Sequence, residues 1–326
     1  MPQPYPLQRV LFVQKAELID QQKTLVYQQL TDALGPLAIT CISSPDAVEA
    51  RSHFDAVITP TLPWLPDLLH RLDSYRWLHF LSAGVEKIWP MDFDKHNVLL
   101  TKSSGVHGPA MSEYALGAML YFAKQFGRFH DQSQQRQWQR TWLDELTGRT
   151  VAILGLGHIG QTIAQRAKAF DMTVWGTLNH PRPMPQVDQV FSHDQLYAQL
   201  PEVDYLVVCL PLTPTTHNLV NQDVLAQLKP GAVLIDISRG GIVSASAVLQ
   251  ALDSGVLKGA ALDVFEHQPL PETSPLWARS DILLTPHVSG TTPYYLERAL
   301  DIFIQNAQQL ALGQAPITPV DVAAGY

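Results

Sequence analysis

The sequence predicts an α/β protein of two domains with parallel sheets, in which one domain is inserted into the other. Strand-like and helix-like segments alternate along the whole chain, an order typical of parallel sheets joined by helical crossovers. The length of 326 residues exceeds that of a typical single core and fits two domains. A phosphate-binding glycine pattern occurs in the middle of the chain and is missing from the strands before it, which separates the two domains.

The first part of the chain contains candidate strands and helices that form one unit. Apolar runs predict strands at residues 10–13, 56–59, 77–81 and 98–101. Helical spacing of apolar residues predicts helices at 17–33 and 65–72.

The glycine pattern lies between a predicted strand at 150–154 and a predicted helix at 161–170. A strand, a G-x-G-x-x-G motif and a helix in this order predict a dinucleotide-binding Rossmann unit. The first glycine permits a tight turn, the second lets the backbone approach a pyrophosphate, and the third lets helix and strand pack closely. The helix N-terminus then favours the phosphates. The residues expected at the cofactor here are Gly155, Gly157, His158, Ile159 and Gly160.

The elements around this motif complete the second domain. A long helix is predicted at 109–126, and further strands at 173–177, 205–209, 233–237, 260–264 and 282–285. An amphipathic helix at 293–310 is expected to pack back on the first unit. The predicted domains are therefore a catalytic domain formed by residues 1–104 and 291–326, and an inserted cofactor domain formed by residues 105–290.

Composition and charge exclude several classes of protein. A net charge of −8 argues against a general affinity for nucleic acid or an acidic membrane. No apolar run approaches the roughly 18 residues of a membrane helix, and residues 1–10 lack the features of a signal peptide. The two cysteines, Cys41 and Cys209, fit a reducing cytoplasm, and the histidines and cysteines do not cluster as a metal site.

Polar side chains follow three consecutive strands of the second domain. Arg239 follows the strand at 233–237, a polar segment containing Glu266 and Gln268 follows 260–264, and His287 follows 282–285. Ligands of doubly wound sheets bind at these carboxyl ends. Hydride transfer to a 2-keto acid needs a cation to hold the carboxylate and polarise the carbonyl, and an acid to protonate the oxygen. Alone, the arginine could be a surface ion pair and the histidine a turn residue, but their joint placement favours a catalytic site.

At these positions the chain resembles the D-isomer-specific 2-hydroxyacid dehydrogenases. The resemblance covers nearly the whole chain, and residues 269–271 and 274–277 are most similar to the glyoxylate/hydroxypyruvate reductase branch. The matching segments are 81–85 (LSAGV), 112–114 (SEY), 155–160 (GLGHIG), 210–216 (LPLTPTT), 236–240 (DISRG), 262–265 (LDVF) and 285–287 (TPH).

The resemblance implies two Rossmann-like domains, a cleft, a homodimer and a role for each matching residue. Arg239 would hold the substrate's carboxylate and carbonyl, and His287 would be the acid and base. The backbone of Ala83, Gly84 and Val85 would bind the carboxylate. The residues implied to contact the cofactor are Asp263 at the nicotinamide carboxamide and Pro211, Thr213 and Thr216 along the cofactor.

Gln268 departs from the family pattern, which has a glutamate at this position. A neutral Gln268 can orient the ring of His287 but supplies no charge to favour its protonated form. We therefore expect a pH optimum for reduction shifted toward acid. Glu266 could substitute, but its spacing from Asp263 is two residues too short.

The loop after the strand at 173–177 also departs from the pattern of NAD-specific proteins. Such proteins place an acid there to bind the ribose hydroxyls. Here the loop carries Asn179, His180 and Arg182, which could accept a 2′-phosphate. This favours NADP over NAD, although a plain exposed loop would look the same.

The sequence thus predicts a cytoplasmic, NAD(P)H-dependent reductase of small 2-keto acids. A non-catalytic nucleotide sensor and a dehydrogenase of formate or another small anion are the alternatives. Trp138 and Trp142 could cover a dimer contact or the cleft, or pack locally, and His107 and Trp64 are possible pocket residues.

Overall fold

A computed structural model describes residues 7–322, so part of the segment assessed for a signal peptide, residues 1–6, lies outside the described residues. The chain divides into two compact units. Unit 1 comprises residues up to Val106 and from Thr292 onward, and unit 2 comprises His107–Thr291. These boundaries differ by one or two residues from those expected from the sequence.

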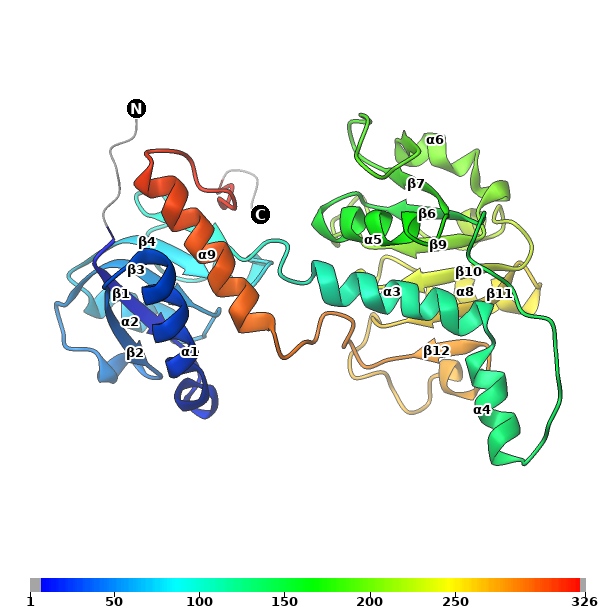
Figure 1. Cartoon of the computed structure of the whole chain (residues 1–326), viewed down its shortest axis with the longest axis horizontal. Coiled ribbons are helices and arrows are strands. Elements are labelled where there is room, and N and C mark those ends of the chain that lie inside the picture. The colour runs from blue at the N-terminus through cyan, green and yellow to red at the C-terminus, as the bar shows by residue number, and fades with distance from the viewer. Residues whose placement is uncertain (1–6, 323–326) are drawn as a thin grey trace. The chain divides into compact units, whose positions relative to one another are not determined.

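Unit 1 is a parallel five-stranded sheet in the order β2-β1-β3-β4-β5, covered by helices (Figure 1). Its strands are β1 (Arg9–Val13), β2 (Ala38–Ile42), β3 (His53–Thr59), β4 (Ser74–Phe80) and β5 (Leu99–Lys102). Its helices are α1 (Ala16–Leu34), α2 (Leu65–Arg71) and α9 (Tyr295–Ala311), with short 3₁₀ turns η1 (Pro45–Ala47) and η2 (Glu86–Ile88).

The last helix packs on unit 1, as the sequence predicts. Helix α9 lies beside α1 on one face of the sheet (Figure 1), where Leu300 and Phe303 join a buried cluster with Val26 and Leu30. Helix α2 contributes to a second cluster with strands β1 and β4. Strand β2 was not predicted, because only Ile39 and Ile42 of this short edge strand are buried.

Unit 2 is a parallel seven-stranded sheet in the order β12-β11-β10-β9-β6-β7-β8. Its strands are β6 (Thr150–Leu154), β7 (Thr173–Thr177), β8 (Gln189–Phe191), β9 (Tyr205–Val208), β10 (Ala232–Asp236), β11 (Leu257–Leu262) and β12 (Ile282–Leu284). Its helices are α3 (Gly108–Ala123), α4 (Phe126–Gln134), α5 (His158–Lys168), α6 (His193–Tyr197), α7 (Gln222–Leu225) and α8 (Ala245–Asp253), with 3₁₀ turns η3 (Leu200–Glu202) and η4 (Pro275–Ala278).

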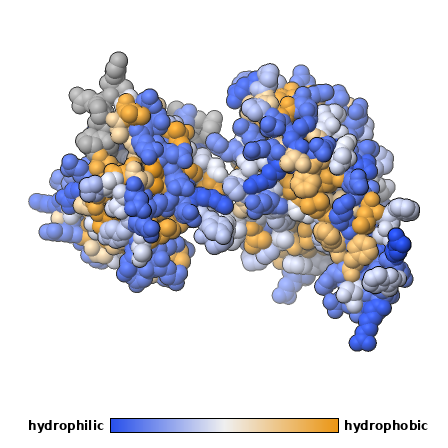
Figure 2. All heavy atoms as spheres, in the orientation of Figure 1, coloured by the Kyte–Doolittle hydropathy of each residue, from blue (hydrophilic) through white to orange (hydrophobic). Residues whose placement is uncertain are grey.

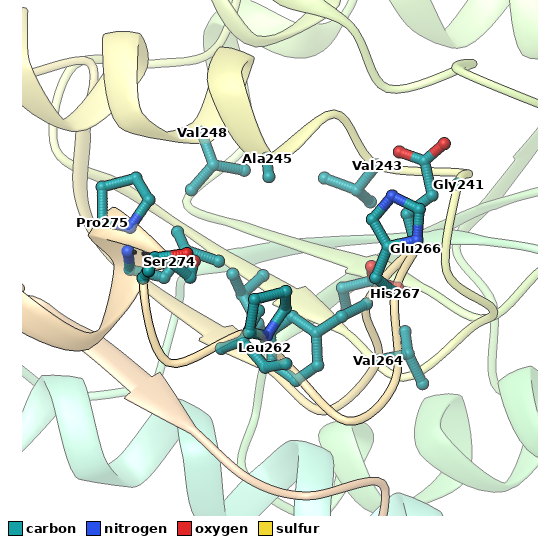
Figure 3. A pocket seen from close by; sticks show the side chains of 16 residues that line it. Gly241, Val243, Ala245, Val248, Leu262, Val264, Glu266, His267, Ser274 and Pro275 are labelled. Atoms are coloured by element: carbon teal, nitrogen blue, oxygen red, sulfur yellow. Dashed lines mark hydrogen bonds between the residues drawn. The ribbon is translucent and has the colours of Figure 1, made fainter.

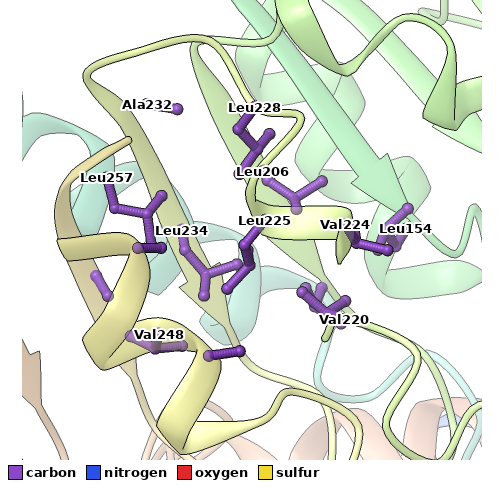
Figure 4. Close-up of a cluster of buried hydrophobic side chains, with 14 of the residues drawn as sticks. Leu154, Leu206, Val220, Val224, Leu225, Leu228, Ala232, Leu234, Val248 and Leu257 are labelled. Carbon is purple, nitrogen blue, oxygen red and sulfur yellow. The ribbon is translucent and has the colours of Figure 1, made fainter. Parts of the chain in front are cut away.

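The chain order of this sheet reverses between β6 and β9, which lie side by side. Such a switch point leaves a ligand crevice at the carboxyl ends of the strands. Buried apolar clusters cover both faces of the sheet. Helices α3 and α5 complete one cluster, and Figure 4 shows the other, in which Leu206 and Leu234 from the sheet pack near Val224 and Val248 from helices α7 and α8.

The helix expected at 109–126 is interrupted. Helix α3 ends at Ala123, and Gln125 adopts the left-handed conformation with φ 51° before α4 begins at Phe126. An extended segment follows, in which Trp138 and Trp142 are 96% and 97% exposed. The alternative that these tryptophans pack locally is therefore wrong.

The surface of the described chain is mixed in polarity. Figure 2 shows polar side chains over most of the visible face, with apolar residues in small groups among them. Between residues 7 and 322, no helix is long and apolar enough to cross a membrane, and no three histidine, cysteine or acidic side chains are grouped as a metal site.

Candidate active site

The turn between β6 and α5 has the geometry of a phosphate-binding loop. Gly155 has φ 101°, a conformation that favours glycine. A Cβ on Gly160 would collide with the carbonyl oxygen of Gly155, so the third glycine permits close packing of helix on strand. A Cβ on Gly157 would meet nothing within 4 Å, so the backbone here is open to a ligand. Gly157 caps α5 without a side-chain hydrogen bond, which leaves the first-turn N–H groups of His158 and Ile159 to an anion.

The loop after β7 carries exposed polar and cationic side chains. Asn179, His180 and Arg182 are all exposed. The acid that follows in this loop, Asp188, accepts hydrogen bonds from Lys168 Nζ at 3.0 Å and from the Val174 amide at 2.7 Å. Asp188 is thus engaged in fixing the start of β7.

The loop after β9 is a turn held by threonine side chains. The Thr216 hydroxyl donates to the carbonyl oxygen of Pro211 at 2.7 Å and accepts from the Thr213 amide at 2.8 Å. These bonds fix the shape of the segment that the family resemblance places along the cofactor, and Pro211 itself is exposed.

Arg239 stands at the end of β10 on a tight, crowded turn. Its guanidinium Nη1 donates to the Ser238 carbonyl oxygen at 2.8 Å, and the side chain is exposed. A Cβ on Gly240 would collide with the carbonyl of Phe265, so the turn packs directly on the segment after β11. Below it, burial raises the pKa of the Asp236 carboxyl to about 7, although hydrogen bonds from the Ser238 hydroxyl and amide act in the opposite direction.

Gln268 and His287 form the hydrogen-bonded pair that the sequence suggested. Gln268 Oε1 lies 2.9 Å from His287 Nδ1. Gln268 Nε2 donates to the Phe265 carbonyl oxygen at 3.1 Å, which turns the amide oxygen toward the ring. His287 Nδ1 is therefore the protonated nitrogen of the neutral ring, and Nε2 is left to exchange a proton with a substrate.

His287 itself has φ 56°, in the left-handed region that non-glycine residues seldom occupy. The buried carboxylate of Asp263 holds the loop in this shape. It accepts hydrogen bonds from the Thr285 hydroxyl at 2.6 Å, the Val288 amide at 2.8 Å and the Ser289 amide at 2.9 Å. The sequence placed Asp263 at the cofactor. In the structure its carboxylate is hydrogen-bonded to the His287 loop through these three donors.

Two cavities flank the segment after β11. One, of about 520 Å³, is lined by Gln268, His287 and mainly apolar neighbours that include Trp277 and Leu284. The other, of about 320 Å³, is lined by Glu266 together with residues of α8 and the 270–276 segment (Figure 3). Glu266 thus lines a different cavity from His287, and Gln268 is the side chain hydrogen-bonded to the ring.

His107 lies near Arg239 and His287, and their charges affect its pKa. Its Nδ1 is 3.2 Å from the Gly290 carbonyl oxygen. Burial lowers the pKa of His107, the bond to Gly290 opposes this effect, and the positive charges of Arg239 and His287 lower the pKa further. The other suggested pocket residue, Trp64, lies in unit 1 at the start of α2, where it packs on a buried apolar cluster.

The segment expected to bind a carboxylate, Ala83 to Val85, follows β4 in unit 1. Val85 is buried and is the N-cap residue that precedes the turn η2. The carboxylate of Glu86 lies against Gly84, so a Cβ there would displace the end of this exposed side chain.

The structure adds residues to the site that the sequence reasoning did not single out. Tyr114, from α3, is hydrogen-bonded to Thr285 with 2.7 Å between the hydroxyl oxygens. Both residues occur in segments that match the family, but neither spacing nor residue type indicated that their side chains meet.

Known proteins match both the sequence and the structure. Residues 116–289 match the family model described as the NAD-binding domain of D-isomer-specific 2-hydroxyacid dehydrogenases. A glyoxylate/hydroxypyruvate reductase A from Serratia proteamaculans is 32% identical over 273 residues, which is 81% of this chain and 87% of the relative.

Two crystal structures show the same fold. One is a D-isomer-specific 2-hydroxyacid dehydrogenase family protein from Aeromonas salmonicida, with a TM-score of 0.80 and 32% identity over 96% of this chain and 99% of that chain. The other is an NADPH-dependent glyoxylate/hydroxypyruvate reductase from Sinorhizobium meliloti in complex with NADP and sulfate, with a TM-score of 0.78 and 26% identity over 98% of this chain and 100% of that chain.

Fold, motif order and relatives together define an oxidoreductase that uses a nicotinamide dinucleotide, NADP or NAD. The chain belongs to the D-isomer-specific 2-hydroxyacid dehydrogenase family.

Proposed function

We propose that the protein reduces small 2-keto acids such as glyoxylate or hydroxypyruvate to 2-hydroxy acids, with the D configuration where the product is chiral. The observation that carries the proposal is the Gln268–His287 pair. It presents one ring nitrogen to a substrate at the carboxyl end of the sheet, in the same unit as Arg239 and the dinucleotide loop. The names of the relatives support the substrate class.

In the proposed reaction each side chain has one task. A nicotinamide dinucleotide held at the Gly155–Gly160 loop would supply the hydride for the keto carbon. Arg239 holds the carboxylate and polarises the carbonyl oxygen. In its protonated form, with a proton on each ring nitrogen, His287 donates the Nε2 proton to that oxygen and becomes neutral, while Nδ1 keeps its proton and its hydrogen bond to Gln268. The Ala83–Val85 backbone is proposed to offer N–H groups to the carboxylate, and unit 1 therefore acts as the catalytic domain.

The direct test is the loss of nicotinamide absorbance with glyoxylate, hydroxypyruvate, pyruvate and a bulkier keto acid. Turnover with the small keto acids is expected. Tight cofactor binding without turnover across a pH series would instead favour a nucleotide sensor. Turnover only in the oxidative direction with formate would favour the dehydrogenase of a small anion.

We also propose a preference for NADPH, because Arg182 and His180 are exposed after β7 and Asp188 is engaged elsewhere. The value of kcat/KM should be higher with NADPH than with NADH. Arg182→Ala should lower this value for NADPH by about tenfold, the loss expected for one charge-assisted hydrogen bond, and leave NADH nearly unaffected. Equal losses with both cofactors would contradict a contact to the 2′-phosphate.

Gln268→Glu should move the pH profile of reduction toward higher pH. A carboxylate in place of the amide accepts the same bond from His287 Nδ1 and adds a negative charge that favours the protonated ring. It also loses the donor to the Phe265 carbonyl, so some activity should be lost at every pH. The measurement is kcat against pH for the wild type, Gln268→Glu and the control Glu266→Gln. An unchanged profile in Gln268→Glu would refute a charge-based role for this position.

A homodimer is part of the proposal, supported by the extended segment after α4. Exposed tryptophans are concentrated at protein interfaces, and Trp138 and Trp142 are almost fully exposed. The mass of the protein in solution, measured by light scattering, should be twice that of the chain.

The proposed location is the cytoplasm. The thiols of Cys41 and Cys209 are both free, which fits a reducing compartment. Cell fractionation should recover the protein with cytoplasmic markers.

A further inference from the structure

A chain of three polar side chains links helix α3 to the loop that carries His287. The Tyr114 hydroxyl lies 2.7 Å from Thr285 Oγ1, and Thr285 Oγ1 lies 2.6 Å from Asp263 Oδ1. The three residues come from α3, from the end of β12 and from the end of β11. Tyr114 thus contacts this loop from helix α3, whereas Thr285 and Asp263 contact it from the ends of strands.

The hydrogen-bond directions in this chain follow from the number of protons available. The Asp263 carboxylate is an acceptor, and it also receives the amides of Val288 and Ser289. Thr285 has a single hydroxyl proton and donates it to Asp263. Tyr114 must therefore donate its proton to Thr285. Burial raises the pKa of Tyr114 to about 12, so the donor keeps its proton throughout the neutral range.

Hydrogen bonds hold the backbone both before and after His287. Thr285 precedes it by two residues and is fixed through its hydroxyl and through its amide, which donates to the Leu262 carbonyl at 3.1 Å. Val288 and Ser289 follow it and are fixed by Asp263. The left-handed φ of 56° at His287 is an unfavourable conformation that the surrounding bonds must maintain.

We propose that Tyr114 is a positioning residue for His287, acting through Thr285 and Asp263. Its hydroxyl orients the Thr285 hydroxyl toward Asp263, and this bond holds the loop so that the ring of His287 stays on Gln268 with Nε2 toward the substrate. This role deepens the proposed function and rests on it.

The test compares Tyr114→Phe with Tyr121→Phe, a matched control on the same helix. Phenylalanine keeps the ring of Tyr114 and removes the donor. We expect Tyr114→Phe to lower kcat by about 3- to 10-fold, the effect of one lost hydrogen bond. The KM for the keto acid and the dissociation constant of NADPH should remain near the wild-type values. Amide exchange at Val288 and Ser289, followed by mass spectrometry, should become faster. Tyr121→Phe should change neither kcat nor this exchange.

Variants of Thr285 separate positioning from a general loss of stability. Thr285→Ser keeps the hydroxyl and should retain most of kcat, whereas Thr285→Val should lose at least as much as Tyr114→Phe. The double variant Tyr114→Phe/Thr285→Val should be no slower than Thr285→Val alone, because both changes break the same chain. Additive losses, or equal losses in KM and in kcat, would overturn the proposal.

The exchange measurement distinguishes failure of this inference from failure of the proposed function. If the wild-type protein reduces no keto acid but Tyr114→Phe accelerates exchange at Val288 and Ser289, the positioning chain stands and the reductase assignment does not. If the wild-type protein is active, and kcat and exchange are both unchanged in Tyr114→Phe, the positioning role is refuted.

Discussion

His287→Asn is expected to lower kcat for keto-acid reduction by about 10²- to 10⁴-fold, the range typical of a lost general acid. The carbonyl oxygen gains negative charge as the hydride arrives, and an amide cannot supply the proton that Nε2 of the imidazolium would give. Arg239 would still bind the carboxylate, so KM should change much less than kcat. The dissociation constant of NADPH should stay close to that of the wild type.

Asparagine is chosen because of the backbone at this position. His287 has φ 56°, and asparagine tolerates the left-handed region better than alanine or glutamine. An Asn amide can also donate to Gln268 Oε1 in place of Nδ1. The loop held by Asp263 should therefore keep its shape, and the loss of activity should report on proton transfer.

The measurement is kcat and KM across pH for the wild type, His287→Asn and His70→Asn, a control at an exposed histidine of α2. The control should behave like the wild type. In His287→Asn, the alkaline limb of the pH profile, where the wild-type ring loses the proton that it must donate, should vanish, and added imidazole should restore part of kcat in proportion to its concentration. A variant that keeps more than about a tenth of the wild-type kcat would show that another group or water donates the proton.

The parts of the site that the sequence predicts well depend on local patterns. The dinucleotide loop was recognisable because its glycines are needed for local reasons. Gly155 has a positive φ, and Gly160 allows a close contact between helix and strand. The pairing of Gln268 with His287 could be expected from the family spacing. The rotation of the Gln268 amide could not, because it depends on the Phe265 carbonyl, which contacts the side chain only after the loop folds.

The parts that sequence reasoning missed are set by tertiary contacts. The expected helix at 109–126 breaks at Gln125, a residue without a helix-breaking signature, and the polypeptide continues as the short helix α4. The link between Tyr114 and Thr285 joins residues 171 positions apart, and neither residue type indicates the other. Strand β2 lies at the edge of its sheet, where partial exposure weakens the apolar pattern.

Unit 1 is expected to lose about 2 kcal/mol of its free energy of unfolding between about pH 7.5 and about pH 5 because of one buried histidine. His79 is fully buried on strand β4, and burial lowers its pKa from 6.5 to about 3. Between these two pKa values the unfolded chain binds a proton at this position and the folded chain does not. Stability from this group is therefore complete above pH 6.5 and is lost as the pH falls below it.

Burial is the main reason why the folded state resists the proton, and it outweighs a backbone hydrogen bond at Ala299 that raises the pKa of His79. The side-chain hydrogen bonds around the ring are those of a neutral histidine. The Trp77 indole donates to Thr101 Oγ1 at 2.8 Å, and that oxygen lies 2.7 Å from His79 Nδ1. On the other side, Ser103 Oγ donates to the Phe80 carbonyl and lies 3.1 Å from His79 Nε2. The consistent assignment has Thr101 donating to Nδ1 and Nε2 donating to Ser103, so the neutral ring uses both nitrogens. A second ring proton would face the Thr101 hydroxyl proton and place a charge in the core.

The comparison that isolates this effect is His79→Gln against the wild type and against His70→Gln at the exposed surface. The measurement is urea unfolding at several pH values, monitored by hydrogen exchange of the β1 and β4 amides. These amides report on the stability of unit 1 alone, so the titration of Asp236 in unit 2 does not affect the result. Glutamine does not titrate, so His79→Gln should be less stable than the wild type at neutral pH. The stability difference should then shrink toward pH 5, because only the wild type loses stability from this position. His70→Gln should follow the wild type at every pH. The stability difference between His79→Gln and the wild type could instead stay constant with pH. The buried ring would then take up its proton as readily as the unfolded chain does, and the hydrogen-bond assignment around His79 would have to be reversed.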